Sequence, residues 1–140
     1  MVDEAYTEFM EDGNDHTVIP LISEGYDIIV AKTLSKIHGF AGLRIGYALG
    51  TKASIERIKK YSQWPVTPSG PAVEAAKASL VDYEFLDYCR EENRKAKEKT
   101  YSILKSQNFK YIPSYTSFAL FEIPISPSEF LPQMEEKVWV

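Results

Sequence analysis

The sequence from Asp82 to Gln107 has the pattern of one long helix, and few small folds can hold such a helix. At 1.5 Å per residue its 26 residues would span roughly 39 Å, more than the width of a small domain. The side chains expected on its buried face are Phe85, Cys89, Ala96, Ile103 and Leu104. The segment before it, Trp64–Pro71, holds three prolines and cannot continue a helix. We therefore expect the helix to connect a first domain to a second.

The first part of the chain alternates strand and helix patterns. Asp27–Lys32 is a β-branched run of strand length, and Leu43–Gly50 alternates and closes on glycine. Lys52–Ser62 has helical periodicity, and Ala72–Leu80 is an alanine-rich helix that Pro71 can start. This alternation predicts an α/β fold.

The end of the chain continues the mixed pattern. Ser117–Ile123 predicts a strand, Ser128–Glu136 a short helix, and Lys137–Val140 the start of another strand. Met1–Asp3 reads as the end of a strand with no earlier strand to pair with it. Since the final apolar run is also cut, we expect an internal piece of a longer protein.

Composition excludes several classes of protein. The 140 residues include 16 Lys+Arg and 20 Asp+Glu, and the resulting net charge of −4 does not predict a nucleic-acid partner. No apolar run approaches the roughly 20 residues of a membrane-spanning helix. Cys89 is the single cysteine, so no internal disulfide can form, and His16 and His38 lack a metal-ligand spacing. We expect no metal site, no membrane partner and a cytoplasmic location.

Four short segments carry residue types that can do chemistry. They are Asp3-Glu4-Ala5-Tyr6, Thr33-Leu34-Ser35-Lys36, Gly39-Phe40-Ala41-Gly42 and Arg44. Each alone has an ordinary explanation, because an Asp-Glu pair at a strand end is usually solvated and two close glycines often mark only a turn. The carboxyl ends of parallel strands, however, meet at one crevice. Such a sheet would bring a carboxylate, hydroxyls and an amine together, and the glycine turn could return the arginine to them.

The chemistry of these groups is complementary. A guanidinium binds phosphate through paired, charge-assisted hydrogen bonds, and a lysine amine forms imines with aldehydes. The chain resembles the fold-type I pyridoxal-phosphate enzymes, specifically class I/II aminotransferases of the histidinol-phosphate aminotransferase branch. That family reads Asp-Glu-Ala-Tyr, Thr-x-Ser-Lys and Gly-x-Ala-Gly-Leu-Arg-x-Gly, and this chain carries these segments, in that order, at residues 3–6, 33–36 and 39–46.

The resemblance covers effectively the whole chain and implies its fold and domains. The fold would be α/β, comprising part of a three-layer α/β/α large domain and the start of a small α+β domain. Residues 1–70 would be the C-terminal part of the large, cofactor-binding domain and 71–107 the connecting helices. Residues 108–140 would begin a truncated small domain.

The resemblance also implies residue roles with pyridoxal 5'-phosphate. Lys36 would form the internal aldimine and move a proton between substrate and cofactor. Asp3 would keep the pyridine nitrogen protonated, and Tyr6 would hydrogen-bond the phenolic oxygen. The residues expected to hold the phosphate are Thr33, Ser35 and Arg44.

The implied activity is transamination between a 2-oxo acid and an amino acid or a histidinol-phosphate-like amine. Family members act as homodimers, so a homodimer is expected of the full-length protein. Threonine-phosphate decarboxylases share these motifs and remain an alternative. Ser117 stands where relatives often carry asparagine, and three further parts of such a site would lie outside this chain. A catalytically incomplete piece that acts only as an interaction module is therefore the other alternative, and we expect this piece alone to be inactive.

Overall fold

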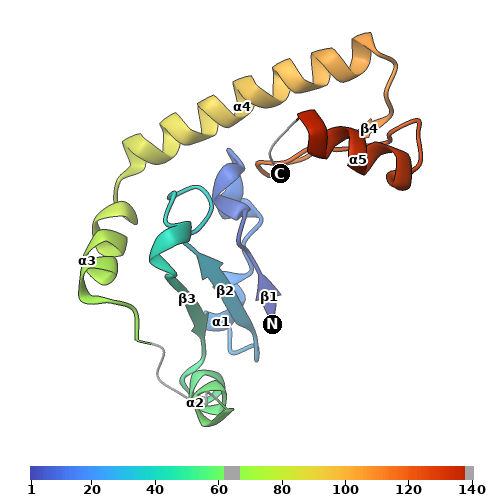
Figure 1. Cartoon of the computed structure of the whole chain (residues 1–140). Coiled ribbons are helices and arrows are strands. Elements are labelled where there is room, and N and C mark those ends of the chain that lie inside the picture. Colours follow the sequence, from blue (N-terminus) through green and yellow to red (C-terminus); the bar gives the residue numbers. More distant parts are fainter. Residues whose placement is uncertain (62–66, 138–140) are drawn as a thin grey trace.

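The computed structural model describes residues 1–61 and 67–137, arranged as two groups of elements joined by one long helix (Figure 1). The first group contains a small sheet with helices around it, and the second contains a two-stranded hairpin and a helix. Residues 64–66 of the expected proline-rich link and 138–140 of the expected last strand lie outside the described residues.

The sheet of the first group has the strand order β1 (Val2–Asp3), β2 (Ile29–Thr33) and β3 (Gly46–Gly50). β1 pairs with β2 in parallel, with Asp3 beside Ala31. β2 pairs with β3 in antiparallel register, from Ile29 beside Gly50 to Thr33 beside Gly46. The carboxyl ends of β1 and β2 therefore lie at the same edge of the sheet.

The two strands predicted over residues 27–32 and 43–50 both exist, with shifted bounds. β2 begins two residues later than expected and ends one residue later, at Thr33. The strand predicted from Leu43 begins only at Gly46, because Ala41–Leu43 form a 3-10 turn (η3) and Arg44 has a left-handed backbone with φ +50°. A left-handed residue cannot continue an extended strand, so the turn shortens β3.

Short helical segments surround the sheet. Two 3-10 turns, η1 (Thr7–Phe9) and η2 (Gly13–Asp15), precede α1 (Ile19–Ser23), and α2 (Lys52–Tyr61) follows β3. The predicted alanine-rich helix is α3 (Gly70–Ser79). Its start is capped by the Ser69 hydroxyl, which accepts a hydrogen bond from the Ala72 N–H.

A small apolar core joins α3 to the sheet. Ala72 and Ala76 of α3 are buried against Leu34 and Ile45, which flank the ends of β2 and β3. The small alanine side chains let the helix approach these two residues closely. Since Leu34 is the first residue after β2, the loop that follows this strand packs on the core.

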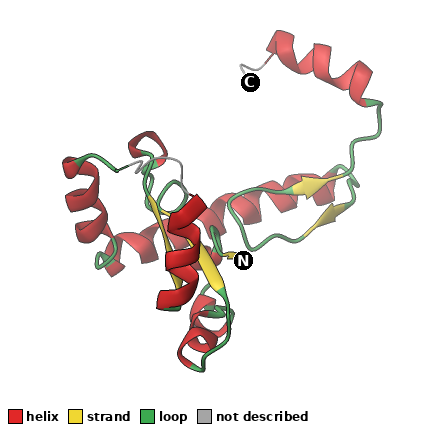
Figure 2. Cartoon of the chain, turned by 90° about the horizontal axis from the view of Figure 1, so that it is seen from below, coloured by secondary structure: helices red, strands yellow, loops and turns green. Residues whose placement is uncertain are grey.

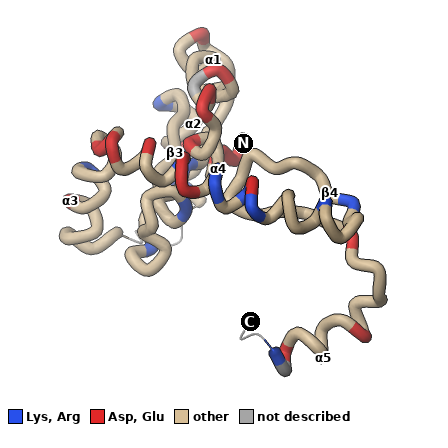
Figure 3. The backbone as a smooth tube through the Cα atoms, turned by 90° about the horizontal axis from the view of Figure 1, so that it is seen from above, with Lys and Arg blue, Asp and Glu red and all other residues tan. Residues whose placement is uncertain are grey.

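The long helix is α4 (Tyr83–Ser106), and the predicted cap is confirmed because the Asp82 carboxylate accepts the Phe85 N–H at 3.1 Å. Acidic and basic residues are mixed along its middle (Figure 3), where Arg94 pairs with both Glu91 and Glu98. Among the described residues, no helix has the length and apolar character needed to cross a membrane.

The predicted buried face of α4 is wrong by about one residue. Phe85, Ala96 and Ile103 are exposed and Cys89 is half-buried, while Leu104 is buried as expected. The inward positions are Leu86, Arg90, Asn93, Lys97 and Leu104. Their spacing of three, four and seven residues is helical, but three of them are polar. An apolar pattern could not find this face because its middle makes hydrogen bonds.

The second group follows α4. β4 (Tyr111–Ile112) and β5 (Leu120–Phe121) form an antiparallel hairpin, so the strand predicted over residues 117–123 is only two residues long. The hairpin lies beside α4 (Figure 2), and Tyr101 of α4 stacks on Tyr111 of β4 with ring centroids 4.7 Å apart. The predicted last helix is α5 (Pro127–Lys137), which corrects the expectation that its final residue begins a strand.

Candidate active site

The structure brings the first two sequence segments together at the carboxyl ends of β1 and β2. The Glu4 N–H donates to the Ala31 carbonyl at 3.0 Å, which extends the parallel pairing one residue beyond Asp3. The Lys36 amine then lies 5.2 Å from the centroid of the Tyr6 ring. This separation is within the range of a cation–π contact. Tyr6 and Lys36 are therefore neighbours, although 30 positions separate them in the chain.

Asp3 and Tyr6 line one hollow of about 380 Å³. Asp3 is exposed, and its Oδ1 accepts the Ala5 N–H at 3.0 Å. Tyr115 and Thr116, from the segment before β5, line the same hollow. The second group of elements therefore contributes to the surroundings of Asp3.

Phe118 fixes the Tyr6 ring from the side of the second group. The two rings meet edge to face, with centroids 5.5 Å apart and planes at 86°. Such an arrangement is favourable for aromatic pairs. Tyr6 thus contacts both Lys36 and Phe118.

The loop after β2 presents Lys36 to solvent and buries two apolar residues close to it in the chain. Leu34 and Ile37 are buried, whereas Lys36 is exposed. The Phe40 N–H donates to the Leu34 carbonyl at 2.9 Å and closes the loop. Gly39 makes this closure possible with φ +73°, a conformation that side chains disfavour.

The two hydroxyl residues of the motif lie at the start of this loop and are half-buried. The Thr33 Oγ1 accepts the Ser35 N–H at 3.1 Å, a local turn that ends the strand. Thr33 also pairs with Gly46 across the sheet. Thr33 and Ser35 are thus placed beside the strand end that carries Lys36.

The backbone of Arg44 lies close to this strand end. It stands two residues before Gly46, the partner of Thr33 in the sheet. Its Nη1 donates to the Ala41 carbonyl at 2.8 Å, so the guanidinium lies over its own turn and is exposed. The structure therefore puts Arg44 near the predicted phosphate-binding residues without bonding it to them.

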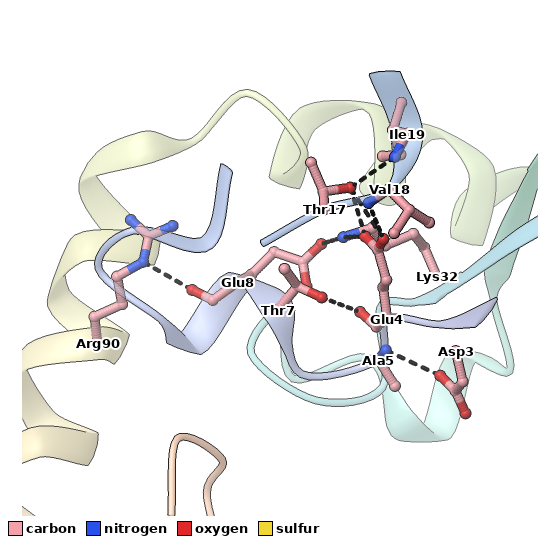
Figure 4. A network of polar contacts seen from close by, with 10 residues as sticks. All are labelled: Asp3, Glu4, Ala5, Thr7, Glu8, Thr17, Val18, Ile19, Lys32 and Arg90. Atoms are coloured by element: carbon pink, nitrogen blue, oxygen red, sulfur yellow. Dashed lines mark hydrogen bonds and ion pairs between the residues drawn. The ribbon is translucent and has the colours of Figure 1, made fainter. Parts of the chain in front are cut away.

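Glu4 is a residue whose environment the sequence did not reveal. A solvated carboxylate was expected at this strand end, but Glu4 is only 5 % exposed. Its carboxylate accepts the Val18 N–H at 2.8 Å and lies 2.9 Å from the Lys32 amine (Figure 4). The available signal was a lysine inside an apolar strand, since a buried lysine requires an anionic partner.

The charges of this cluster stabilise one another. Burial alone would raise the pKa of Glu4, but the Val18 hydrogen bond and contacts with Lys32 and Thr17 outweigh it and lower that pKa. Burial would lower the pKa of Lys32, but its contacts with Glu8 and Glu4 outweigh it and raise that pKa. Across residues 1–61 and 67–137 no cluster of three or more His, Cys, Asp or Glu side chains is placed to hold a metal ion. Lys32 supplies the positive charge of the cluster.

A buried histidine connects the loop that carries Lys36 to α3. His38, two residues after Lys36, is 5 % exposed, and its Nδ1 lies 2.8 Å from the Ser79 Oγ at the end of α3. No local pattern predicts this contact, because the two residues are 41 positions apart. α3 therefore contacts this loop through Ala72, Ala76 and Ser79.

The chain is similar to known aminotransferases. The family model of aminotransferase class I and II matches residues 1–137. The histidinol-phosphate aminotransferase of Lysinibacillus sphaericus (strain C3-41) is 27% identical over 140 residues, which are 100% of this chain and 38% of that protein. The chain thus spans well under half the length of this relative.

Two solved structures share the fold. The putative histidinol-phosphate aminotransferase of Erwinia carotovora atroseptica SCRI1043 matches 95% of this chain and 38% of its own, with TM-score 0.87 and 31% identity. The histidinol-phosphate aminotransferase of Sinorhizobium meliloti, solved in complex with pyridoxal-5'-phosphate, matches 96% and 37%, with TM-score 0.82 and 26% identity. Both have the type I fold, so the α/β class expected from the sequence is confirmed. The chain belongs to the aminotransferase class I and II family.

Proposed function

We propose that the full-length protein is a pyridoxal-phosphate-dependent aminotransferase. It would pass an amino group between a 2-oxo acid and an amino acid or a histidinol-phosphate-like amine. The observation that carries this proposal is the Lys36 amine against the Tyr6 ring, at the strand ends where Asp3 also lies, in a chain of this family. The relatives named above are aminotransferases, which favours transamination over decarboxylation.

The donor groups fit pyridoxal 5'-phosphate. Lys36 offers an exposed primary amine to an aldehyde, and the exposed Asp3 carboxylate can accept a pyridinium N–H. The guanidinium expected to bind phosphate belongs to Arg44, with hydroxyls from Thr33 and Ser35. When bound, the cofactor would supply an electron sink for the carbon that loses a proton.

The chain's own residues would then orient the reactants and move the proton. Lys36 Nζ would hold the proton and return it, because this amine is exposed and lies against the Tyr6 ring at the strand ends. Asp3 would hold positive charge at the ring nitrogen, and Tyr6 would donate its phenolic proton as a hydrogen bond. The Tyr6 ring can keep one orientation because Phe118 packs against it.

The same proposal extends to the whole protein. Residues 1–70 would be the end of the large domain, 71–107 the connecting helices and 108–140 the start of the small domain. The position of α4 between the two groups supports this division (Figure 1). We also propose a cytoplasmic homodimer, in line with the family resemblance.

A product assay tests the proposed reaction. The full-length protein, supplied with pyridoxal 5'-phosphate, an amine donor and 2-oxoglutarate, is expected to form glutamate. Release of carbon dioxide instead would favour a decarboxylase, and failure to take up the cofactor would favour an interaction module. Lys36→Ala is expected to reduce glutamate formation to background, while Lys52→Ala, at an exposed position of α2, is expected to keep it. Undiminished activity of Lys36→Ala would contradict the proposal.

A further inference from the structure

Asp3 and Glu4 are adjacent, but their side chains lie in different environments. Successive side chains of an extended segment point to opposite sides. The Asp3 carboxylate is exposed and bonds to the Ala5 N–H, whereas the Glu4 carboxylate is buried against Lys32 (Figure 4). Fixing Glu4 on the inner side therefore fixes the direction in which Asp3 points.

Several groups bind the buried Glu4 carboxylate. Its two oxygens accept the Thr17 hydroxyl at 3.0 and 2.8 Å and the Val18 N–H at 2.8 Å. The Lys32 amine lies 2.9 Å away. Both side chains of this ion pair are nearly buried, with 7% exposure for Lys32 and 5% for Glu4. Ion pairs that exclude water lose little strength to salt and solvent.

Lys32 holds a second carboxylate as well. Its amine lies 2.9 Å from Glu8 in η1, so one ammonium joins two residues that flank Tyr6. Lys32 itself belongs to β2, the central strand of the sheet. The Arg90 Nε donates to the Glu8 carbonyl at 2.7 Å and links the same turn to α4. The turn that carries Tyr6 is thus held to β2 by two ion pairs with Lys32 and to α4 by one hydrogen bond from Arg90.

We propose that Lys32 is a positioning residue, which through Glu4 and Glu8 sets the directions of Asp3 and Tyr6 toward the cofactor. The proposal rests on the proposed function for its cofactor, but the fastening of the turn can be measured without it. Lys32 points into the buried cluster and acts through these two neighbours.

Lys32→Met in the full-length protein tests the role directly. The substitution keeps an unbranched side chain of similar length, but it leaves Glu4 and Glu8 without their cation. In the cofactor-free protein, hydrogen–deuterium exchange at the Ala5 and Val18 amides is expected to become about tenfold faster. The affinity for pyridoxal 5'-phosphate is expected to fall about tenfold, because small displacements of orienting groups are costly.

A spectroscopic measurement separates positioning from stability. The visible absorbance of the bound cofactor changes with pH and can be titrated. If Lys32→Met displaces Asp3, the midpoint of this titration is expected to shift by about one pH unit. The matched control is Lys59→Met, which removes a lysine from an exposed ion pair with Glu56. This control is expected to leave exchange, affinity and midpoint unchanged, and Lys32→Arg is expected to restore all three.

The outcomes decide the proposal in either case. If Lys32→Met lowers Tm but leaves exchange, cofactor affinity and midpoint at wild-type values, the residue only stabilises the fold and the proposal is overturned. If Lys32→Met does not fold, Glu4→Gln, which keeps the shape of the side chain, is measured in the same way with the same expectations. If the wild-type protein takes up no cofactor, the proposed function fails, and amide exchange alone decides whether Lys32 holds the turn.

Discussion

Arg44 combines a side chain that the proposed phosphate site requires with a backbone that favours glycine. Its φ of +50° lies in the left-handed region, which costs a non-glycine residue roughly 1 kcal/mol. Asn108, with φ +56° after the end of α4, is in a similar conformation and lies far from Arg44 along the chain. These two residues allow the conformational cost to be separated from the chemical role.

Arg44→Gly is expected to keep or raise stability by up to about 1 kcal/mol while weakening cofactor binding at least tenfold. Stability is measured by urea unfolding and binding by cofactor titration of the full-length protein. Asn108→Gly is expected to give a similar gain in stability with unchanged binding. Equal cofactor affinity for Arg44→Gly and the wild type would remove Arg44 from the proposed site.

His38 provides a prediction about pH. Burial lowers its pKa below the ordinary value, and the opposing charge of Glu8 does not reverse this. The unfolded chain therefore binds a proton more readily than the folded one, and stability falls as pH drops below about 6.5. His38→Gln is expected to reduce the slope of the unfolding free energy against pH between pH 8 and 5. The reduction is expected to be less than about 1.4 kcal/mol per pH unit. An unchanged slope in His38→Gln would contradict this explanation of the pH dependence.

The residue identities at the candidate site could be read from the sequence, but their environments could not. The segments that hold Asp3, Tyr6 and Lys36 were recognisable from their order and spacing, and the structure brings two of these residues into contact. The burial of Glu4 depends on Thr17 and Val18, which a turn of irregular backbone returns to it. No local pattern encodes such a return.

The elements show a similar division between local and distant causes. Residue types predicted the N-cap of α4 at Asp82 and the end of β3 at Gly50. The start of β3 was wrong because the left-handed turn at Arg44 is not visible in an alternating pattern. The buried face of α4 was wrong because polar groups hold it, as when Lys97 donates to the Ser114 carbonyl at 2.8 Å.

Close contact between β2 and β3 makes Gly46 sensitive to substitution. A Cβ at this position would lie 2.7 Å from the Lys32 carbonyl oxygen, which belongs to the backbone and cannot swing away. Gly46→Ala is expected to destabilise the protein by more than about 1 kcal/mol in urea unfolding. Gly42→Ala has open space around it and is expected to change stability by less than about 0.5 kcal/mol. Equal stability of the two variants would contradict the observed strand register.

At the scale of the whole molecule, α4 connects two groups of elements that meet again near Tyr6. Asn93 on this helix donates to the Thr116 carbonyl at 3.2 Å, and Thr116 lines the hollow that contains Asp3. The connecting role of the helix followed from its length, but the return of residues 114–118 to Tyr6 did not. That return depends on contacts between segments more than 100 residues apart.

Lys36 is the residue that we propose to bind the cofactor covalently. The most direct test mixes the full-length protein with pyridoxal 5'-phosphate, reduces the imine with borohydride and maps the adduct by mass spectrometry. The label is expected on the peptide containing Lys36 and is expected to disappear in Lys36→Ala. A label on Lys52 or Lys59, or one that survives in Lys36→Ala, would contradict the account.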